Sequence, residues 1–409
     1  MERLFPHRRL AALCLILASC GGAPAASLTR AVTDTLPGGI VRVMSPGPTA
    51  WADSAGARLL EEGRFQGQDG TAAELGEPRS IAVDALDRIY VADRKPTSIK
   101  VFTADGKLVR VIGREGEGPG EFRAGFIAVR GAHLVLHDPE LARTSVWDTS
   151  GTFLRSWHSS CCYWSDIQVD RLDRISVPSV VPGNPGDPPH GAPYVRWTMD
   201  GVAVDTLWVP VRESPKHWTI TLGRGTKNMV SMMTGVPLMP ETVWTLHPDG
   251  GLLVGWTGAY SVVRSGTGRD SVRVFGRAWT PEAASDERRK AAVEERIKQS
   301  AQQFTADALR AAFHLDDVPR TLPAFESLRV DLSGRVWVRR YAVADTSRTL
   351  YDVFDSTGAW LGPVSVPLRI PEYGLQAWTR DGLVAIVEDA EGRPTVVRLR
   401  LVLAEARRR

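Results

Sequence analysis

The residues best suited to bind a ligand are polar or aromatic side chains that end short runs of apolar and β-branched residues. At such positions a carboxylate can bind a cation, a histidine can exchange a proton and an arginine can bind an anion. The mixed charges argue against a dedicated metal site, and turn caps or solvated charges are the simpler interpretation of the same pattern. The candidate ligand-binding residues are Asp93, His137, Asp138, Trp256, Arg340 and Glu388.

Sequence motifs of the common catalytic sites do not occur in the chain. It contains no GxSxG elbow, no P-loop, no HExxH helix and no CxxC or His/Cys zinc pattern. The glycine-rich stretch 116–120 is acidic and is followed by no helical pattern, which favours a connecting loop over a phosphate cradle. We therefore assign no catalytic residue, no metal ligand and no cofactor, and an axial divalent cation is an option without support.

Two of the four cysteines, Cys161 and Cys162, are adjacent in the chain. Outside a reducing cytosol they could form a vicinal disulfide, stay reduced or pair between molecules. The other two, Cys14 and Cys20, lie in the N-terminal segment.

That N-terminal segment has the pattern of an export signal. Basic residues precede a short apolar run, Leu10 to Leu17, which is too short to span a bilayer as a stable helix. The following Leu17–Cys20 resembles the bacterial lipobox, which implies cleavage after residue 19 and lipidation of Cys20. Gly21 after the cysteine then favours the outer membrane. An ordinary secretory signal with an incidental cysteine is the alternative, and residues 20–57 are expected to be a tether and N-terminal extension, with 21–39 as the tether.

Composition fits a folded domain with a full core. The chain has 409 residues, of which 43% are hydrophobic, and a net charge of +3. Loss of residues 1–19 would remove three arginines and one glutamate, which leaves about +1. Such a balanced charge argues against a nucleic-acid partner.

The elements that must position the candidate residues come from an internal repeat. Ile81–Val91 aligns without gaps with Ile167–Val177, and Leu328–Val338 is a third copy. Each copy predicts two short strands joined by a polar turn. A second hairpin with an Asp-Gly or Ser-Gly type of turn follows most copies, for example at Val101–Gly106. Two hairpins make a four-stranded unit that must stack on its neighbours to bury both faces.

Counting these units predicts an all-β protein: a six-bladed β-propeller of four-stranded antiparallel blades that spans residues 58–403. The last unit lacks a fourth strand, and we expect residues 58–65 to supply it and close the ring, with tryptophans packed between the blades. Residues 404–409 form a basic tail. The predicted blades are residues 78–122, 123–157, 163–210, 240–277, 323–367 and 373–403.

These residues resemble bacterial six-bladed β-propeller lipoproteins of the NHL-repeat and TolB-like superfamily. The resemblance is clearest at Ile89–Asp93, Asp105-Gly106 and Gly116–Phe122, and it implies the fold rather than the function.

Two segments interrupt the repeat. Residues 281–315 combine an apolar stripe at helical spacing with a charged opposite face, which predicts one or two amphipathic helices inserted between blades four and five, starting at Thr280-Pro281. We expect this insertion to be a strut on the side of the propeller, with a cap or partner-binding arm as the alternative. The proline-rich stretch 178–193 predicts a long loop in blade three.

Two functions fit these observations. The first is a non-enzymatic module, lipid-anchored in the cell envelope, that binds a protein, peptide or glycan through one face of the propeller. The second is a metal-dependent hydrolase or lyase similar to lactonase-type propellers, which would need several carboxylates converging on an axial cation.

Overall fold

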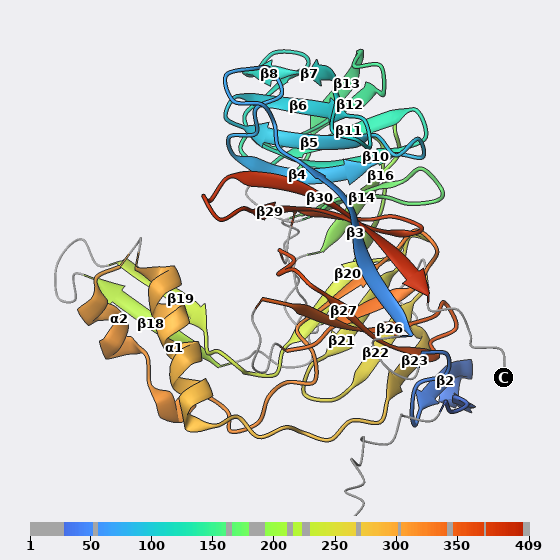
Figure 1. Ribbon diagram of the computed structural model, residues 1–409, viewed down its shortest axis with the longest axis vertical. Coiled ribbons are helices and arrows are strands. Elements are labelled where there is room, and N and C mark those ends of the chain that lie inside the picture. Colours follow the sequence, from blue (N-terminus) through green and yellow to red (C-terminus); the bar gives the residue numbers. More distant parts are fainter. Residues whose placement is uncertain are drawn as a thin grey trace, which may run out of the picture.

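The computed structural model describes residues 28–51, 56–160, 166–179, 193–210, 216–222, 230–266, 271–301, 304–341, 347–371 and 374–403. The chain is mostly β, and its sheets are stacked side by side with one helical projection (Figure 1). Within the described residues, no helix has the length and apolar character needed to cross a bilayer.

Three separate four-stranded antiparallel sheets follow one another in the first half of the chain, and each has its strands in sequence order. In all three the outermost strand pairs with a register shift, a bulge that twists the sheet. Their strands are β4 (Pro78–Val83), β5 (Ile89–Arg94), β6 (Thr97–Phe102) and β7 (Leu108–Ile112); β10 (Phe126–Arg130), β11 (His133–Asp138), β12 (Arg143–Asp148) and β13 (Phe153–His158); and β14 (Gln168–Val169), β15 (Ile175–Pro178), β16 (Tyr194–Trp197) and β17 (Ala203–Leu207).

The glycine-rich stretch after the first of these sheets is a connection, as expected. Its ends pair as β8 (Arg114–Glu115) and β9 (Glu121–Phe122). The Glu121 carboxylate accepts a hydrogen bond from the Gly118 amide at 2.9 Å, and Phe122 is buried.

A fourth meander consists of β20 (Thr242–Leu246), β21 (Leu252–Trp256), β22 (Ser261–Ser265) and β23 (Ser271–Arg277), and an N-terminal hairpin extends it. In that hairpin β1 (Val32–Leu36) pairs with β2 (Ile40–Ser45) around the short helix η1 (Pro37–Gly39), and β2 runs parallel to β23. The predicted tether over 21–39 is therefore wrong from residue 32 onward. Residues 32–36 include three β-branched side chains and complete the hairpin ladder, so they belong to the folded body.

The final sheet brings the two ends of the body together. It combines β24 (Ser327–Val330), β25 (Val336–Arg339), β26 (Thr349–Phe354) and β27 (Trp360–Val366) with β28 (Gln376–Trp378), β29 (Gly382–Glu388), β30 (Pro394–Leu403) and β3 (Ala57–Phe65). β3 pairs antiparallel with β30 from Ala57 opposite Leu403 to Phe65 opposite Val396. The early strand thus supplies the outer edge of the last meander, as predicted.

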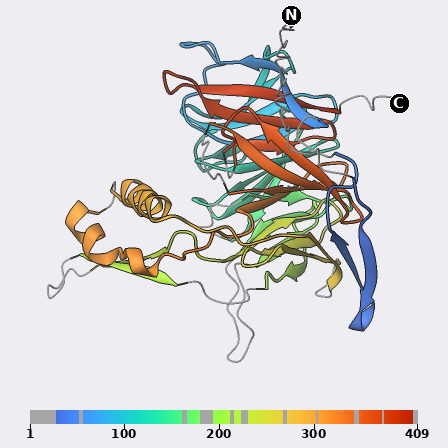
Figure 2. The ribbon, with the colours of Figure 1, turned by 60° about the horizontal axis from the view of Figure 1, so that its bottom comes forward.

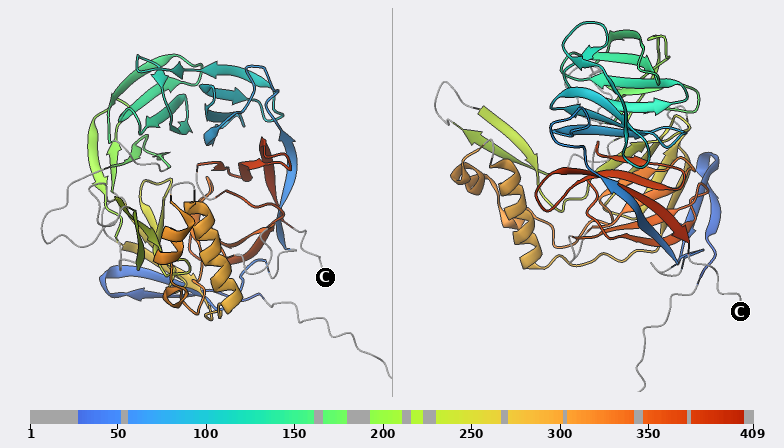
Figure 3. Two further views of the ribbon diagram at one scale, coloured as in Figure 1. Left: turned by 90° about the vertical axis from the view of Figure 1, so that its left-hand side faces the viewer. Right: turned by 45° about the horizontal axis from the view of Figure 1, so that its top comes forward.

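Consecutive meanders are arranged around a common centre (Figure 3). Each neighbouring pair shares a buried cluster, and the cluster around Ile81, Phe102 and Val384 joins the last meander to the first. The predicted role of tryptophan is confirmed at Trp147 and Trp337, each only 1% exposed between sheets. Each sheet alone would leave both of its apolar faces exposed to water, and these long-range clusters bury them between neighbouring sheets.

The two faces of this ring are built from different connections. On one face, called here the turn face, lie the tight turns between first and second and between third and fourth strands. At three of the turns between first and second strands an aspartate, Asp84, Asp170 or Asp331, accepts hydrogen bonds from the amides two and four residues later. The aspartate side chain thus stabilises its own turn, which explains why the pattern Asp-x-x-(Asp/Gly)-Arg recurs along the chain. The opposite face, called the insertion face, carries the connections between sheets and between second and third strands.

A helical arm leaves the insertion face and extends away from the stacked sheets (Figures 1 and 2). It combines the hairpin β18 (His217–Leu222) and β19 (Val230–Gly235) with α1 (Asp286–Ser300), α2 (Ala306–Ala312) and η2 (Leu315–Asp317). Trp218 stacks on Phe313 with ring centroids 4.5 Å apart. The buried members of its own core are Trp218, Ile220, Val236, Leu238, Ala284, Phe304, Leu309, Phe313, Val318 and Leu322.

The arm corrects two expectations. The helices do not form a strut on the side of the ring, because their apolar stripe, including Val293 and Ile297, packs in the same cluster as the β18–β19 hairpin. The first helix begins at Asp286 rather than at Pro281, since the Ser285 hydroxyl caps it by accepting from the Arg288 amide.

Candidate functional site

Two predicted ligand residues, Asp93 and Asp138, act as internal caps on the insertion face. They are 2% and 1% exposed. Asp93 accepts from the amides of Gly76 and Glu77 at 2.9 and 2.7 Å. Asp138 accepts from the amides of Arg123, Glu140 and Leu141. Each carboxylate therefore fixes the loop that enters its own sheet and has almost no surface for a ligand.

The Asp93 carboxylate also forms a buried ion pair. Lys100 Nζ donates to it at 2.6 Å, and the lysine side chain is only 1% exposed. A buried charge is tolerated when it is paired and hydrogen-bonded in this way.

His137 is fully buried beside two hydroxyl groups. Its Nδ1 lies 3.2 Å from Ser159 Oγ and 3.4 Å from Thr144 Oγ1, and Nε2 has no partner within the described residues. Burial lowers the pKa of this histidine to about 4, so the ring is neutral at pH 7. His137 lines neither of the two cavities described below.

The other predicted residues have different surroundings or lie outside the described residues. Glu388 is exposed at the end of β29, and Trp256 is half-buried at the end of β21. Cys20, Cys161 and Cys162 lie outside the described residues. The structure thus does not gather the candidate residues into one ring of ligands.

Arg340 is the candidate that lines a cavity. It follows β25 on the insertion face, and its Nε donates to Asp352 Oδ2 at 2.9 Å while Nη2 donates to Asp352 Oδ1. Asp352, on β26, is 0% exposed. This bidentate pair fixes the guanidinium plane and leaves the Arg340 side chain 31% exposed.

A second arginine, Arg277 at the end of β23, shares the same carboxylate. Its Nε donates to Asp352 Oδ2 at 2.9 Å, and the Tyr260 hydroxyl donates to the same oxygen at 2.7 Å. The Arg277 guanidinium carbon lies 4.4 Å from the centroid of the Tyr260 ring and 4.9 Å from that of Trp360. Burial, followed by the Asp352 charge, raises the pKa of Tyr260 well above its usual value, so the hydroxyl stays protonated as a donor.

These two arginines lie at the wall of a cavity of about 450 Å³ at the root of the arm, which we call the arm-root cavity. One wall is formed by β23 and β26, and another by the two segments that connect the ring to the arm. The lining residues are Arg277, Ala278, Trp279, Thr280, Glu282, Leu322, Pro323, Ala324, Arg340, Tyr341 and Leu350.

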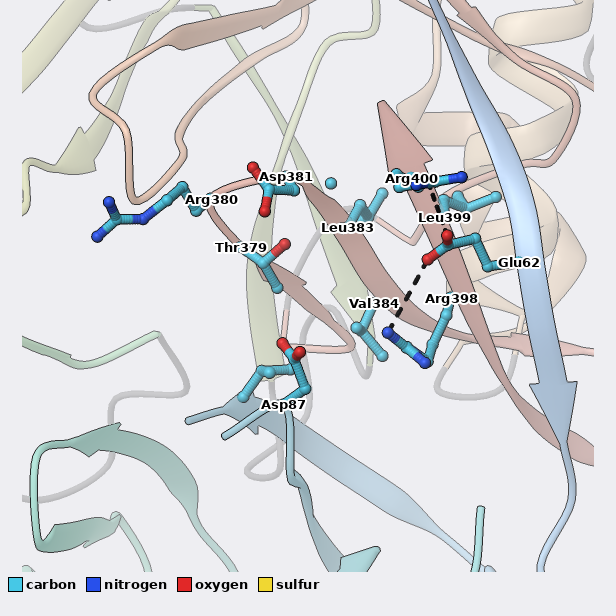
Figure 4. Close-up of a pocket in the computed structure, with 12 residues that line it drawn as sticks. Glu62, Asp87, Thr379, Arg380, Asp381, Leu383, Val384, Arg398, Leu399 and Arg400 are labelled. Atoms are coloured by element: carbon cyan, nitrogen blue, oxygen red, sulfur yellow. Dashed lines mark ion pairs between the residues drawn. The ribbon is translucent and has the colours of Figure 1, made fainter. Parts of the chain in front are cut away.

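A smaller cavity, of about 230 Å³, opens between the first and last sheets near the turns (Figure 4). Here Glu62 on β3 pairs with Arg400 Nε at 2.6 Å and lies 3.9 Å from Arg398 Nη2. Asp87 and Asp381 add two more carboxylates to the lining. Acidic and basic groups are therefore evenly matched, which leaves no excess charge to select a ligand.

An axial metal site finds no support in the described residues. No group of three or more His, Cys, Asp or Glu side chains there is placed to hold a metal ion. The carboxylates Asp93 and Asp138, which that hypothesis would use, are occupied by backbone amides.

Sequence reasoning missed Arg277, Tyr260 and Asp352. A signal for Asp352 was present, because it is a lone charge in the apolar strand Leu350–Phe354. Lys100 and Arg196 occupy comparable third strands, β6 and β16, and are likewise buried in ion pairs with Asp93 and Asp205. On the third strands β6, β16 and β26, a single charge inside the strand is thus buried and ion-paired.

A family model and one solved structure support a β-propeller fold. A model of the DUF5128 family, described as a 6-bladed beta-propeller, matches residues 71–125. A solved structure of a DUF4221 family member from Bacteroides vulgatus is similar over 86% of this chain and 100% of its own, with 10% identity and a TM-score of 0.50. Virginiamycin B lyase from Staphylococcus aureus covers 85% of this chain and 100% of its own, with 12% identity and a TM-score of 0.42.

At these identities the likeness concerns the fold alone. A search of curated proteins finds no match to this sequence. The family model, the similar fold and the arrangement of the sheets around a common centre (Figure 3) together show that the chain is a β-propeller.

Proposed function

We propose that this protein is a lipid-anchored, six-bladed propeller of the cell envelope that binds a protein, peptide or glycan through its insertion face. The observation that carries the proposal is the asymmetry of the ring. The long connections and the arm, with its separate core, leave from one face, whereas the other face has tight turns. Loops on a rigid scaffold are where propellers and other repeat-built rings place their contacts.

The anchoring part of the proposal rests on the sequence. Leu17–Cys20 after a short apolar run supports lipidation of Cys20, and Gly21 supports an outer-membrane destination. We expect Cys20→Ser to release the protein from the membrane fraction. A C20S variant that stays in the membrane fraction would refute the lipid anchor.

The binding part is tested by capture from envelope extracts with two matched variants. Met233 on the arm strand β19 is 70% exposed, and Leu86 in a tight turn of the opposite face is 74% exposed. We expect Met233→Glu to reduce capture of the bound component, because it places a charge in the proposed contact surface, while Leu86→Glu leaves capture unchanged. Capture that depends on Leu86 and not on Met233 would reverse the assignment of the faces.

A further inference from the structure

We propose that the arm-root cavity binds a carboxylate group attached to an apolar body, with Arg277 and Arg340 as the anion-binding residues. This inference rests on the proposed use of the insertion face and names the site and the ligand chemistry.

The first step is the count of charges around Asp352. Two guanidinium groups converge on one carboxylate, and the pair with Arg340 is bidentate. The two guanidinium groups thus exceed this carboxylate, which is 0% exposed, by one positive charge, and Glu282 on the exposed side of the lining carries one negative charge. A guanidinium held in such a partly desolvated place gains more from an anion than one in open water.

The second step is the hydrogen-bond capacity that the network leaves free. Asp352 Oδ2 already accepts from Tyr260, Arg277 and Arg340. Within the described residues, Nη2 of Arg277 and Nη1 of Arg340 donate to no protein atom. Both arginines line the cavity, so these nitrogens are available to a ligand there.

The third step is preorganisation. Arg277 lies against the rings of Tyr260 and Trp360, and its Nη1 also donates to the Ala278 carbonyl at 2.8 Å. The donors are held before a ligand arrives, so little side-chain entropy is lost on binding. By contrast, the guanidinium of the neighbouring Arg339 forms an ion pair with Glu326 and donates a hydrogen bond to the Ile370 carbonyl.

The last step is the shape and lining of the cavity. Leu322, Pro323, Ala324 and Leu350 line it together with the indole of Trp279. Glu282 is an exposed member of the lining and would repel a second negative charge. A volume of about 450 Å³ suits a small organic acid or the last residues of a peptide, and a single carboxylate beside an apolar group fits this lining.

Two sources could present this group, a free organic acid or the C-terminus of a peptide. The test uses the full chain in detergent and measures binding calorimetrically. The probes are indole-3-propionate and its amide, and the tripeptide acetyl-Ala-Ala-Trp with a free or an amidated C-terminus. We expect at least one acid to bind at least tenfold more tightly than its amide, and the tighter acid identifies the source.

Three variants locate the site. Arg340→Gln removes one donor group, and Leu350→Trp fills the cavity from a position that is 37% exposed and outside the Asp352 network. Each should weaken acid binding at least tenfold, and L350W should do so with an unchanged Tm. Arg400→Gln, which removes the same charge from the opposite face, should bind as the parent does.

The proposal is overturned if acids and amides bind equally, if both R340Q and L350W retain acid binding, or if no probe binds at millimolar concentration. Envelope capture that depends on Met233 would still support the insertion face in those cases, so failure of this site is distinguishable from failure of the proposed function.

Discussion

The aspartate turns of the turn face and the Asp352 site of the insertion face bond in opposite ways. On the turn face, Asp84 and Asp331 bond to groups two to six residues away and close their own turns. On the insertion face, Asp352 bonds to Tyr260 and Arg277, which are 92 and 75 residues away. Asp84 and Asp331 thus act as independent local units, whereas Asp352 is the centre of a network shared between sheets and differs from Asp93 and Asp138 on its own face. Substitutions should therefore have small, additive effects at these turns and large, coupled effects around Asp352.

The largest effect is expected at Asp352. Asp352→Ala leaves Arg277 and Arg340 close together without their buried counter-charge, which should lower the free energy of unfolding by about 3–5 kcal/mol. Urea denaturation measures this. A loss below about 1 kcal/mol would show that the network is not a shared support and would remove the contrast between the faces.

The next largest loss of stability is expected on acidification, because of His137 on the insertion face. Its folded-state pKa of about 4 lies below the ordinary value of 6.5 because the ring is buried. Above pH 6.5 both states are neutral and stability is complete. As pH falls toward 4, only the unfolded state takes up the proton, so this group alone should remove about 3 kcal/mol by pH 4.

The measurement is the free energy of unfolding from pH 7 to 4 in the parent and in His137→Gln. The variant should show a flatter profile over this range. Parallel profiles would mean that the histidine is not desolvated in the folded state.

Coupling between the two arginines is the next expectation. Arg277→Gln or Arg340→Gln alone leaves one cation on Asp352, whereas the double substitution leaves the carboxylate buried without one. The double variant should therefore lose more stability than the sum of the single losses, by about 0.5–3 kcal/mol. Simple additivity would contradict a shared network.

The smallest effects are expected on the turn face. Asp84→Ala and Asp355→Ala each remove local turn bonds in different sheets, Asp355 accepting from the Thr357 and Ala359 amides at 2.9 Å. Each substitution should lower the free energy of unfolding by about 1–2 kcal/mol. The double variant should equal the sum within about 0.5 kcal/mol, and a clear excess would show that these turns are not independent.

The fold could be predicted further than the site. The repeats at Ile81–Val91 and Leu328–Val338 each encode strand, turn and strand within eleven residues, and β3 could be recognised as the missing edge strand. The N-terminal hairpin was missed in part because 32–45 does not resemble the repeat and pairs with β23, which lies far along the chain. The candidate site was predicted poorly because residues at strand ends can point into a loop as easily as into a cavity, as Asp93 and Asp138 show.

The sequence by itself determined the turns and strands, because an aspartate that bonds to amides two and four residues later needs only its own neighbours. It also determined the apolar stripe of the arm helices. Only the tertiary structure decided what that stripe packs against and which charges share a buried site. The arm core and the Arg277–Asp352–Arg340 network both join segments far apart in the chain, and their energies depend on burial and on distances that no local pattern contains.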